Sequence, residues 1–359
     1  MPEPIPEPVP ESLCIRPVRA EDHSQLRALL RRVAVITPKE SYRLEREPDA
    51  FALQAYQGTH SQIYVASEDS RILGMVAVAI DRVWIDGEVR EVAYSSEMRV
   101  LPEARGRKLG EMLQLASLDA SCKADGERVP LFNTVMRSNP VGMRMNRYLA
   151  EAGREPVIEL TDVMTYFWPS VIAPLLGRLP GQFRLATADD YPAMAALWQE
   201  LARSRQLARA YRSEEWGAPG RFPPLRPQDW ILAHTGDQLL GFVGVWDQRP
   251  LRQIRLLNPP AALRLLGWHP DLALPLGHCL HLCLKPTARR LLPGLLQQAL
   301  RQARSRGLGL LGLALDAQDP LCECLPASLR LLGSSGRMHL CSTQPPRRPR
   351  PYHLEISLG

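Results

Sequence analysis

Residues 95–113 read SSEMRVLPEARGRKLGEML, and this stretch decides the fold. Strand-forming residues run to Val100, Pro102 stops the strand, and an amphipathic helix begins at Leu109. The turn at residues 105–108 holds two arginines, a lysine and a glycine. A strand that leads through such a turn to a helix N-terminus directs backbone N–H groups toward an anion, and a pyrophosphate fits there. The alternative is a solvated basic turn, but basic residues oppose the helix macrodipole, and a structural turn favours Asp or Ser at this end.

The segments on either side of this turn alternate between strand and helix patterns. Hydrophobic periodicity predicts a hairpin with its turn at residues 68–71, because both arms are rich in strand-forming residues. The expected strands cover residues 13–18, 62–67, 72–89, 89–102, 130–136 and 157–168, and the expected helices cover residues 20–33, 48–57, 109–125 and 140–152. This order predicts a mixed α+β fold without a solenoid period.

The same order then returns after a stretch rich in proline and glycine. Residues 169–182 are this stretch, and they predict a linker. Residues 183–203 follow the strand, polar entry and helix pattern of residues 14–33. A second hairpin pattern comes next, with Gly241 in the place of Gly74. An internal duplication is the simplest explanation.

The two ends of the chain have patterns of their own. Proline stands at every even position from Pro2 to Pro10, which predicts an extended polyproline leader. Near the other end, residues 338–343 and 352–358 predict a hairpin with a basic, solvated tip. The predicted organisation is a disordered leader at 1–12, one domain at 13–168, a linker at 169–182 and a second domain at 183–359.

Composition excludes several classes of protein. The chain has 359 residues, enough for two domains, and shows neither a secretory signal nor an apolar run that could span a membrane. Its seven cysteines are odd in number and scattered, so we expect reduced thiols and a cytoplasmic location. The net charge of +6 divides into −3 for residues 1–180 and +9 for residues 181–359. A basic half without a patch or motif is weak evidence for nucleic-acid binding.

The strand, turn and helix at residues 95–113 resemble the GNAT superfamily of N-acetyltransferases. The family signature, Arg/Gln-x-x-Gly-x-Gly/Ala, binds the pyrophosphate of acetyl-CoA, and its six positions here are Arg105, Gly106, Arg107, Lys108, Leu109 and Gly110. Lys108 departs from the pattern, because it stands where the first signature glycine is expected. If the loop accepts a right-handed conformation there, the lysine adds charge; if phosphate approach is tight, affinity suffers. The resemblance covers about residues 13–168.

This resemblance implies an α+β fold of tandem acyl-CoA N-acyltransferase (GNAT) domains, each a mixed, mostly antiparallel sheet flanked by helices. It further implies that the backbone of Met98, Arg99 and Val100 pairs with the pantetheine arm, with one amide as the oxyanion donor. Asn139 matches a family asparagine that opens the next helix and contacts the cofactor. It can equally be a plain N-cap before Pro140.

Catalysis needs a base for the incoming ammonium and an acid for the leaving thiolate. The resemblance implies Glu97 as the base, although an ordinary edge-strand glutamate would look the same. The family's usual acid is a tyrosine seven residues after the asparagine, but that position is Asn146 here. Tyr148 is the candidate acid, and it lies about 200° further round the helix than Asn146. Water-mediated proton transfer therefore remains open.

The second half keeps less of the site. Lys285, Arg289 and Arg290 follow its fourth strand, but Pro293 interrupts and the glycine spacing is absent, so we expect a degenerate GNAT-like domain that completes the acceptor cleft. Trp216, Trp230 and Trp268 could line that cleft, with core packing as the alternative. The run His278-Cys279-Leu280-His281-Leu282-Cys283 has no Cys-x-x-Cys spacing, and an ordinary buried strand explains it, so we expect no metal.

The sequence thus predicts a tandem GNAT N-acetyltransferase that transfers the acetyl group of its co-substrate acetyl-CoA directly to a primary amine in a ternary complex. A non-catalytic acyl-CoA-binding regulatory protein is the alternative, favoured by Lys108 and by the missing tyrosine. The expected partner is a small-molecule or peptide amine, without nucleic acid or membrane, and a homo-oligomer is left open. The acceptor itself lies beyond the sequence, because variable loops build acceptor pockets.

Overall fold

The fold is described from a computed structural model, for residues 13–36, 41–122, 126–151, 156–177, 179–258, 272–332 and 334–355. The predicted leader at 1–12 lies outside these residues.

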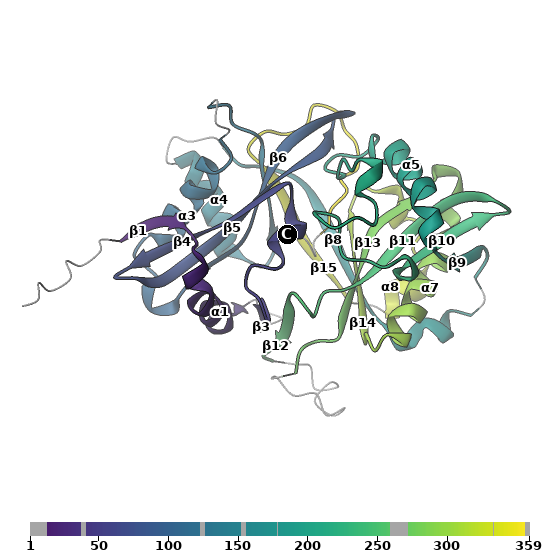
Figure 1. Ribbon diagram of the computed structural model, residues 1–359, viewed down its shortest axis with the longest axis horizontal. Helices are drawn as coiled ribbons and strands as arrows, with labels where there is room; N and C mark the ends of the chain where they lie inside the picture. Colours follow the sequence, from purple (N-terminus) through teal and green to yellow (C-terminus); the bar gives the residue numbers. More distant parts are fainter. Residues whose placement is uncertain are drawn as a thin grey trace, which may run out of the picture.

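One twelve-stranded sheet runs through the molecule (Figure 1). From one edge to the other its strands are β1 (Cys14–Pro17), β4 (His60–Glu68), β5 (Arg71–Ile85), β6 (Glu88–Val100), β7 (Leu131–Met136), β15 (Ser334–Ser342), β8 (Ile158–Pro169), β14 (Leu310–Asp316), β13 (Leu276–Leu284), β11 (Gln238–Asp247), β10 (Trp230–Thr235) and β9 (Gln182–Leu185). Most neighbours are antiparallel, and β6 with β7 and β13 with β14 are the parallel pairs of this sheet within the described residues.

The two halves exchange strands at the centre of this sheet. β15, from the end of the chain, pairs with β7 on one side and with β8 on the other, and β8 in turn pairs with β14. The order is therefore the same from either edge. Five strands of the half at that edge come first, then the last strand of the other half, and then the last strand of the half at that edge. Sequence analysis predicted a separate sheet in each half and a terminal hairpin. The hairpin prediction is wrong for the described residues, because both edges of β15 pair with β7 and β8.

Helices pack against the sheet through their apolar faces. They are α1 (His23–Arg32), α3 (Leu109–Asp119), α4 (Pro140–Glu151), α5 (Tyr191–Ala202), α7 (Leu292–Ser305) and α8 (Ala327–Leu332). In α1, for example, Leu26, Leu29 and Leu30 form one buried stripe. The helix predicted at 48–57 is only α2 (Gln54–Gln57). One reason is that the Ala50 carbonyl accepts a hydrogen bond from the Arg46 side chain.

A second, three-stranded sheet ties the halves together and was not predicted. It consists of β12 (Gln253–Leu256), β3 (Ser41–Glu45) and β2 (Val35–Ile36), with β12 of the second half antiparallel to β3 of the first. The predicted linker is also packed against the body: η3 (Ser170–Leu176) buries Ile172 and Ala173 in the second-half core. The halves are thus held together by backbone pairing as well as by side chains.

Candidate functional site

The parallel strands β6 and β7 separate halfway along their length. Their register runs only from Ala93 opposite Leu131 to Ser95 opposite Asn133. Beyond Ser95, β6 pairs with β5 alone, and β7 pairs with β15 alone. The edge of β6 that faces the gap therefore carries backbone groups that no strand neighbour in the described structure occupies.

A β-bulge lies on β6 immediately beyond this separation. Ser96 stands opposite Ala77 and Arg99 opposite Met75, so Glu97 and Met98 together face one residue of β5. Glu97 has φ of 52°, which is the left-handed region. Such a bulge re-aims the backbone and side chains at a functional edge. Of the predicted pantetheine-pairing residues, Met98 is the second residue of the bulge, and Arg99 and Val100 follow it.

The side chain of Glu97 is buried between two arginines. Its carboxylate accepts from Arg46 Nε at 2.9 Å and from Arg252 Nη1 at 3.2 Å. Burial raises the pKa of Glu97, but the charges of Arg46, Arg252 and Arg99 outweigh burial, so the pKa lies below its usual value. Glu97 is thus an ionised carboxylate and a weak proton acceptor. Its predicted role as the base stays a prediction.

The turn after β6 leads through η2 (Pro102–Ala104) to the N-terminus of α3. The backbone amides of residues 106–111 donate to no acceptor in the described part of the chain, and the first bond is from Met112 N to Lys108 O. Lys108 has φ of 60° and ψ of 14°. The right-handed conformation considered for Lys108 is therefore corrected to the left-handed one, which a glycine adopts without strain. The turn presents a row of six unpaired amides, which is the feature an anion needs.

The basic side chains of this turn divide into two groups. Arg107 forms a two-point ion pair with Glu68 at the end of β4, with distances of 2.6 and 3.0 Å. Arg105 and Lys108 are exposed, and neither forms an ion pair with any described residue. Arg105 and Lys108 are therefore the cations available to a phosphate, whereas Arg107 is held by a carboxylate.

Two substitutions of Lys108 separate the energetic cost of its left-handed backbone from the effect of its charge. Glycine at this left-handed position removes a strain that alanine retains, and both variants lose the ammonium group. We expect Lys108→Gly to be more stable than Lys108→Ala by about 1 kcal/mol. Urea unfolding of the two variants measures this difference. Equal stabilities would contradict the left-handed conformation.

Helix α4 closes the far side of the site. Asn139 Oδ1 accepts from Gly142 N at 3.1 Å, so the N-cap alternative for Asn139 is seen directly. Asn146 is buried and exchanges two hydrogen bonds with Asn133, where β6 and β7 separate. Tyr148 lies two residues on, about 200° round the helix from that face. Its role as the acid stays a prediction, which this geometry does not favour.

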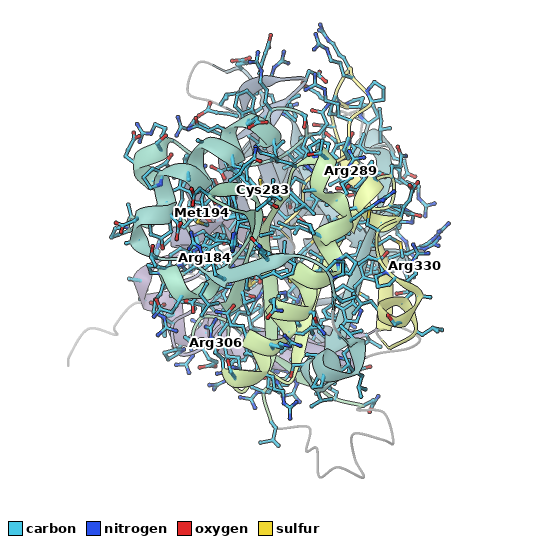
Figure 2. The ribbon with its side chains drawn as sticks, turned by 90° about the vertical axis from the view of Figure 1, so that its right-hand side faces the viewer. Arg184, Met194, Cys283, Arg289, Arg306 and Arg330 are labelled. Carbon is cyan, nitrogen blue, oxygen red and sulfur yellow. The ribbon has the colours of Figure 1, made fainter. Side chains whose placement is uncertain are left out.

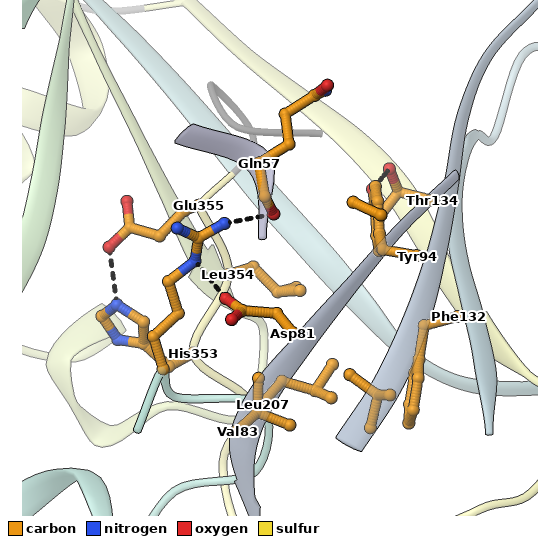
Figure 3. Close-up of a pocket in the computed structure, with 13 residues that line it drawn as sticks. Gln57, Asp81, Val83, Tyr94, Phe132, Thr134, Leu207, His353, Leu354 and Glu355 are labelled. Atoms are coloured by element: carbon orange, nitrogen blue, oxygen red, sulfur yellow. Dashed lines mark hydrogen bonds and ion pairs between the residues drawn. The ribbon is translucent and has the colours of Figure 1, made fainter. Parts of the chain in front are cut away.

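A pocket opens beside the separated strands, between the two halves (Figure 3). It is partly open to solvent and is lined by Gln57, Ala79, Asp81, Val83, Val92, Tyr94, Phe132, Thr134, Leu207, Arg209, His353, Leu354 and Glu355. Arg209 Nε lies 3.1 Å from Asp81, and Arg209 Nη2 donates to the Gln57 carbonyl at 2.6 Å. Sequence analysis missed this pocket, because its walls come from six segments that no motif connects.

Two of the three candidate tryptophans and the Cys/His run of the second half are core residues. Trp216 and Trp230 are buried in one apolar cluster, and Trp268 lies outside the described residues. Cys279 and Cys283 are buried thiols whose pKa values burial raises. Among the described residues one group could hold a metal ion, His281, His353 and Glu355, and none of the cysteines is in it. The expected absence of a metal stays a prediction.

Acid should destabilise the chain through His278 on β13. Burial, with the charge of Arg252, lowers the pKa of His278 from 6.5 to about 3. Between these values the unfolded chain binds the proton and the folded chain does not, so the stability present above pH 6.5 is lost as pH falls. We expect His278→Leu to lose about 2 kcal/mol less stability than the wild type between pH 7 and pH 5. Urea unfolding at both pH values tests this, and equal losses would contradict it.

The corresponding junction of the second half has a different structure. There η7 (Pro286–Leu291) continues into α7 without a left-handed residue, and Leu292 N donates to Arg289 O. Arg289 lies near one end of α7 and Arg306 near the other (Figure 2). Gly294 follows Pro286 at the interval that separates Gly110 from Pro102, while Leu292 stands where the first signature glycine would be.

Comparison with known proteins identifies the fold. Residues 14–132 match the family described as acetyltransferase (GNAT) domain. Saccharomyces cerevisiae N-myristoyltransferase with bound myristoyl-CoA is 12% identical, with a TM-score of 0.63 over 94% of this chain and 84% of that one. A GCN5-related N-acetyltransferase from Sphaerobacter thermophilus is 16% identical, with a TM-score of 0.50 over 80% and 82%. A fungal multi-domain β-N-acetylglucosaminidase with a glucosamine N-acetyltransferase region is 13% identical, with a TM-score of 0.58 over 95% of this chain.

The chain spans 39% of the length of that fungal protein. Comparison with curated proteins finds no match. The predicted fold class is confirmed: the chain has the GNAT fold, a mixed sheet flanked by helices, and its neighbours are N-acyltransferases. No helix of the described residues is long and apolar enough to cross a membrane.

Proposed function

We propose that this protein is an N-acetyltransferase that transfers the acetyl group of acetyl-CoA to a primary amine. The observation that carries the proposal is the row of unpaired amides at residues 106–111, which lies at the end of the strand that separates from β7. The pyrophosphate would bind these amides with Arg105 and Lys108, and the pantetheine arm would pair with the open edge of β6. The acceptor amine would enter the pocket between the halves.

We also propose the tandem organisation, with a donor site at residues 13–168 and a degenerate GNAT-like domain at 183–359. The identical strand order from both edges supports it. A matching ion pair does so as well: Arg16 on β1 holds Asp22 at 2.6 Å, and Arg184 on β9 holds Asp190 at 2.6 Å. The unpaired state of all seven cysteines, each within the described residues, supports the proposed cytoplasmic location.

The chemistry would be direct attack. The amine nitrogen bonds to the thioester carbon, the carbon–sulfur bond breaks, CoA leaves as a thiolate, and the nitrogen releases a proton. Glu97 is the proposed proton acceptor. Because its pKa is low, it would accept the proton once the nitrogen has bonded to carbon and become more acidic. An amide at the β6 bulge would stabilise the oxyanion.

A matched pair of arginine variants tests the donor site. Arg105 follows β6, Arg290 follows β13, and both side chains are exposed, but only Arg105 stands beside the row of unpaired amides. We expect Arg105→Ala to weaken acetyl-CoA binding about tenfold and Arg290→Ala to leave it unchanged. Isothermal titration of the full chain measures both. Equal effects of the two variants would contradict the assignment.

Turnover distinguishes the enzyme from a non-catalytic acyl-CoA-binding protein. Release of the CoA thiol would be followed over a panel of small amines and lysine peptides. Amine-dependent release supports the enzyme, whereas acetyl-CoA binding without release from any amine supports the regulatory alternative.

A further inference from the structure

The second half repeats the bulge of the first at the same register. Gly244 stands opposite Leu280 and Phe242 opposite Cys283, so that two residues of β13 face one residue of β11. The first of the two, His281, has φ of 50°, where Glu97 has 52°. His281 is therefore the counterpart of Glu97.

A glycine faces each bulge from the neighbouring strand. A Cβ atom at Gly74 would lie 2.9 Å from the Arg99 carbonyl oxygen, and one at Gly241 would lie 2.5 Å from the Cys283 carbonyl oxygen. Arg99 and Cys283 each stand two residues after the start of their bulge. At both bulges a glycine lets the neighbouring strand approach the bulged strand closely, so corresponding atoms of the two bulges can be compared.

The amide of the second bulge already has an acceptor. His281 N donates to Glu355 Oε1 at 2.7 Å, and the same oxygen lies 2.8 Å from His281 Nδ1 and 2.8 Å from His353 Nε2. Burial raises the pKa of Glu355, but its contacts with the two histidines outweigh burial and lower it, so this carboxylate is ionised. A negatively charged oxygen thus accepts a hydrogen bond from the bulge amide and lies 2.8 Å from each of two histidine ring nitrogens.

The helix end of the second half also differs from that of the first. A Cβ atom at Gly294 would lie 2.6 Å from the Phe183 ring and 3.0 Å from the Pro180 carbonyl oxygen. The last turn of η7 uses its amides internally, whereas the first-half turn leaves six unpaired. In this half the bulge amide is therefore occupied by the chain itself, and the helix end lacks a row of unpaired amides.

We propose that Glu355 occupies, in the second half, the place of the thioester oxygen, and that the protein therefore binds one acyl-CoA per chain, at its first half. This inference rests on the proposed function. The segment that Glu355 anchors to β13 also forms part of the pocket between the halves, because His353, Leu354 and Glu355 line that pocket. Glu355 is thus a positioning residue: its contacts with β13 fix the wall that an acceptor amine would meet.

Titration of the full chain with acetyl-CoA tests the count of sites. We expect one equivalent for the wild type and none for Gly110→Trp. Two equivalents, or one that persists in Gly110→Trp, would overturn the proposal and leave acyl-CoA binding itself intact. No binding by the wild type would contradict the proposed function instead. In that case the hydrogen-exchange experiment below, which needs no ligand, still tests the contact of Glu355 with the bulge.

Hydrogen exchange of the full chain tests the contact with Glu355. We expect Glu355→Ala to speed exchange of residues 276–284 about tenfold, while residues 92–100 of β6 keep the wild-type rate. Glu355→Gln retains a carbonyl oxygen for the His281 amide and should restore most of the protection. Unchanged exchange in β13, or an equal rise in both strands, would overturn the proposal.

Elemental analysis provides the competing outcome. His281, His353 and Glu355 could hold an ion, since their ligand atoms lie within 4.8 Å of one another. One equivalent of zinc in the purified protein, lost in Glu355→Gln, would overturn the proposal, because the carboxylate oxygen would then be a metal ligand. Protein that remains metal-free after exposure to zinc supports the direct contact.

Discussion

Gly110→Trp is expected to abolish acetyl-CoA binding, with a loss of more than about a hundredfold in affinity. Gly110 lies in the first turn of α3, and a Cβ atom there would already be 3.2 Å from Met145 Sδ on α4. An indole at this position has to displace α4 or lie across the amides of residues 106–111. Either result removes the surface on which the pyrophosphate would bind. Isothermal titration at concentrations up to the millimolar range measures the loss.

Gly110→Ala is the matched control for this variant. Its methyl group meets only the flexible end of Met145, so we expect binding within a few-fold of the wild type. Melting curves of both variants show whether the fold is intact. Wild-type affinity in a folded Gly110→Trp variant would show that the donor does not use this turn.

Asp81→Ala is expected to lower the free energy of unfolding by about 3 kcal/mol. Asp81 lies on β5 of the first half, and its carboxylate contacts Arg209 and Arg221 of the second. All three side chains are less than 10% exposed. Removing the carboxylate leaves two buried guanidinium groups without this partner, although Arg221 keeps Glu215 at 2.8 Å. Urea unfolding gives the change in stability.

Two further variants make this test specific. Asp81→Asn keeps an oxygen acceptor without the charge, and we expect an intermediate loss. Glu88→Ala removes an exposed partner of Arg90, and we expect no measurable change. If Asp81→Ala were as stable as Glu88→Ala, the contact between the halves would not depend on this carboxylate.

Local patterns predicted the elements of the fold well. Alternation and glycine placement gave the hairpin of β4 and β5, and the motif at residues 105–110 gave the start of α3, because both signals lie within a few residues. The exchange of β8 and β15 was not predictable in this way. Nothing in the residues of β15 distinguishes pairing with β7 and β8 from pairing with a following strand, since register depends on distant partners.

In the candidate site, too, the local features were predictable and those that depend on distant residues were not. The turn at Arg105 to Gly110 was predictable, because its chemistry depends on one short stretch of backbone. The Arg107 contact with Glu68, the arginines around Glu97, and the left-handed φ of Lys108 were not, because each depends on neighbours or backbone geometry that the sequence pattern does not specify. The pocket is the extreme case, since Asp81, Arg209 and Glu355 meet from three separate parts of the chain.

The exchanged strand has a consequence for the order in which the protein is completed during synthesis. β7 is made early, yet its partner on one side, β15, ends at Ser342. Until that residue has left the ribosome, β7 keeps an exposed edge of the kind that pairs with other chains. A nascent chain stopped at the predicted linker would therefore carry the donor turn but an unfinished sheet. Among the described strands, the last to be synthesised is the one that completes the sheet of the first half.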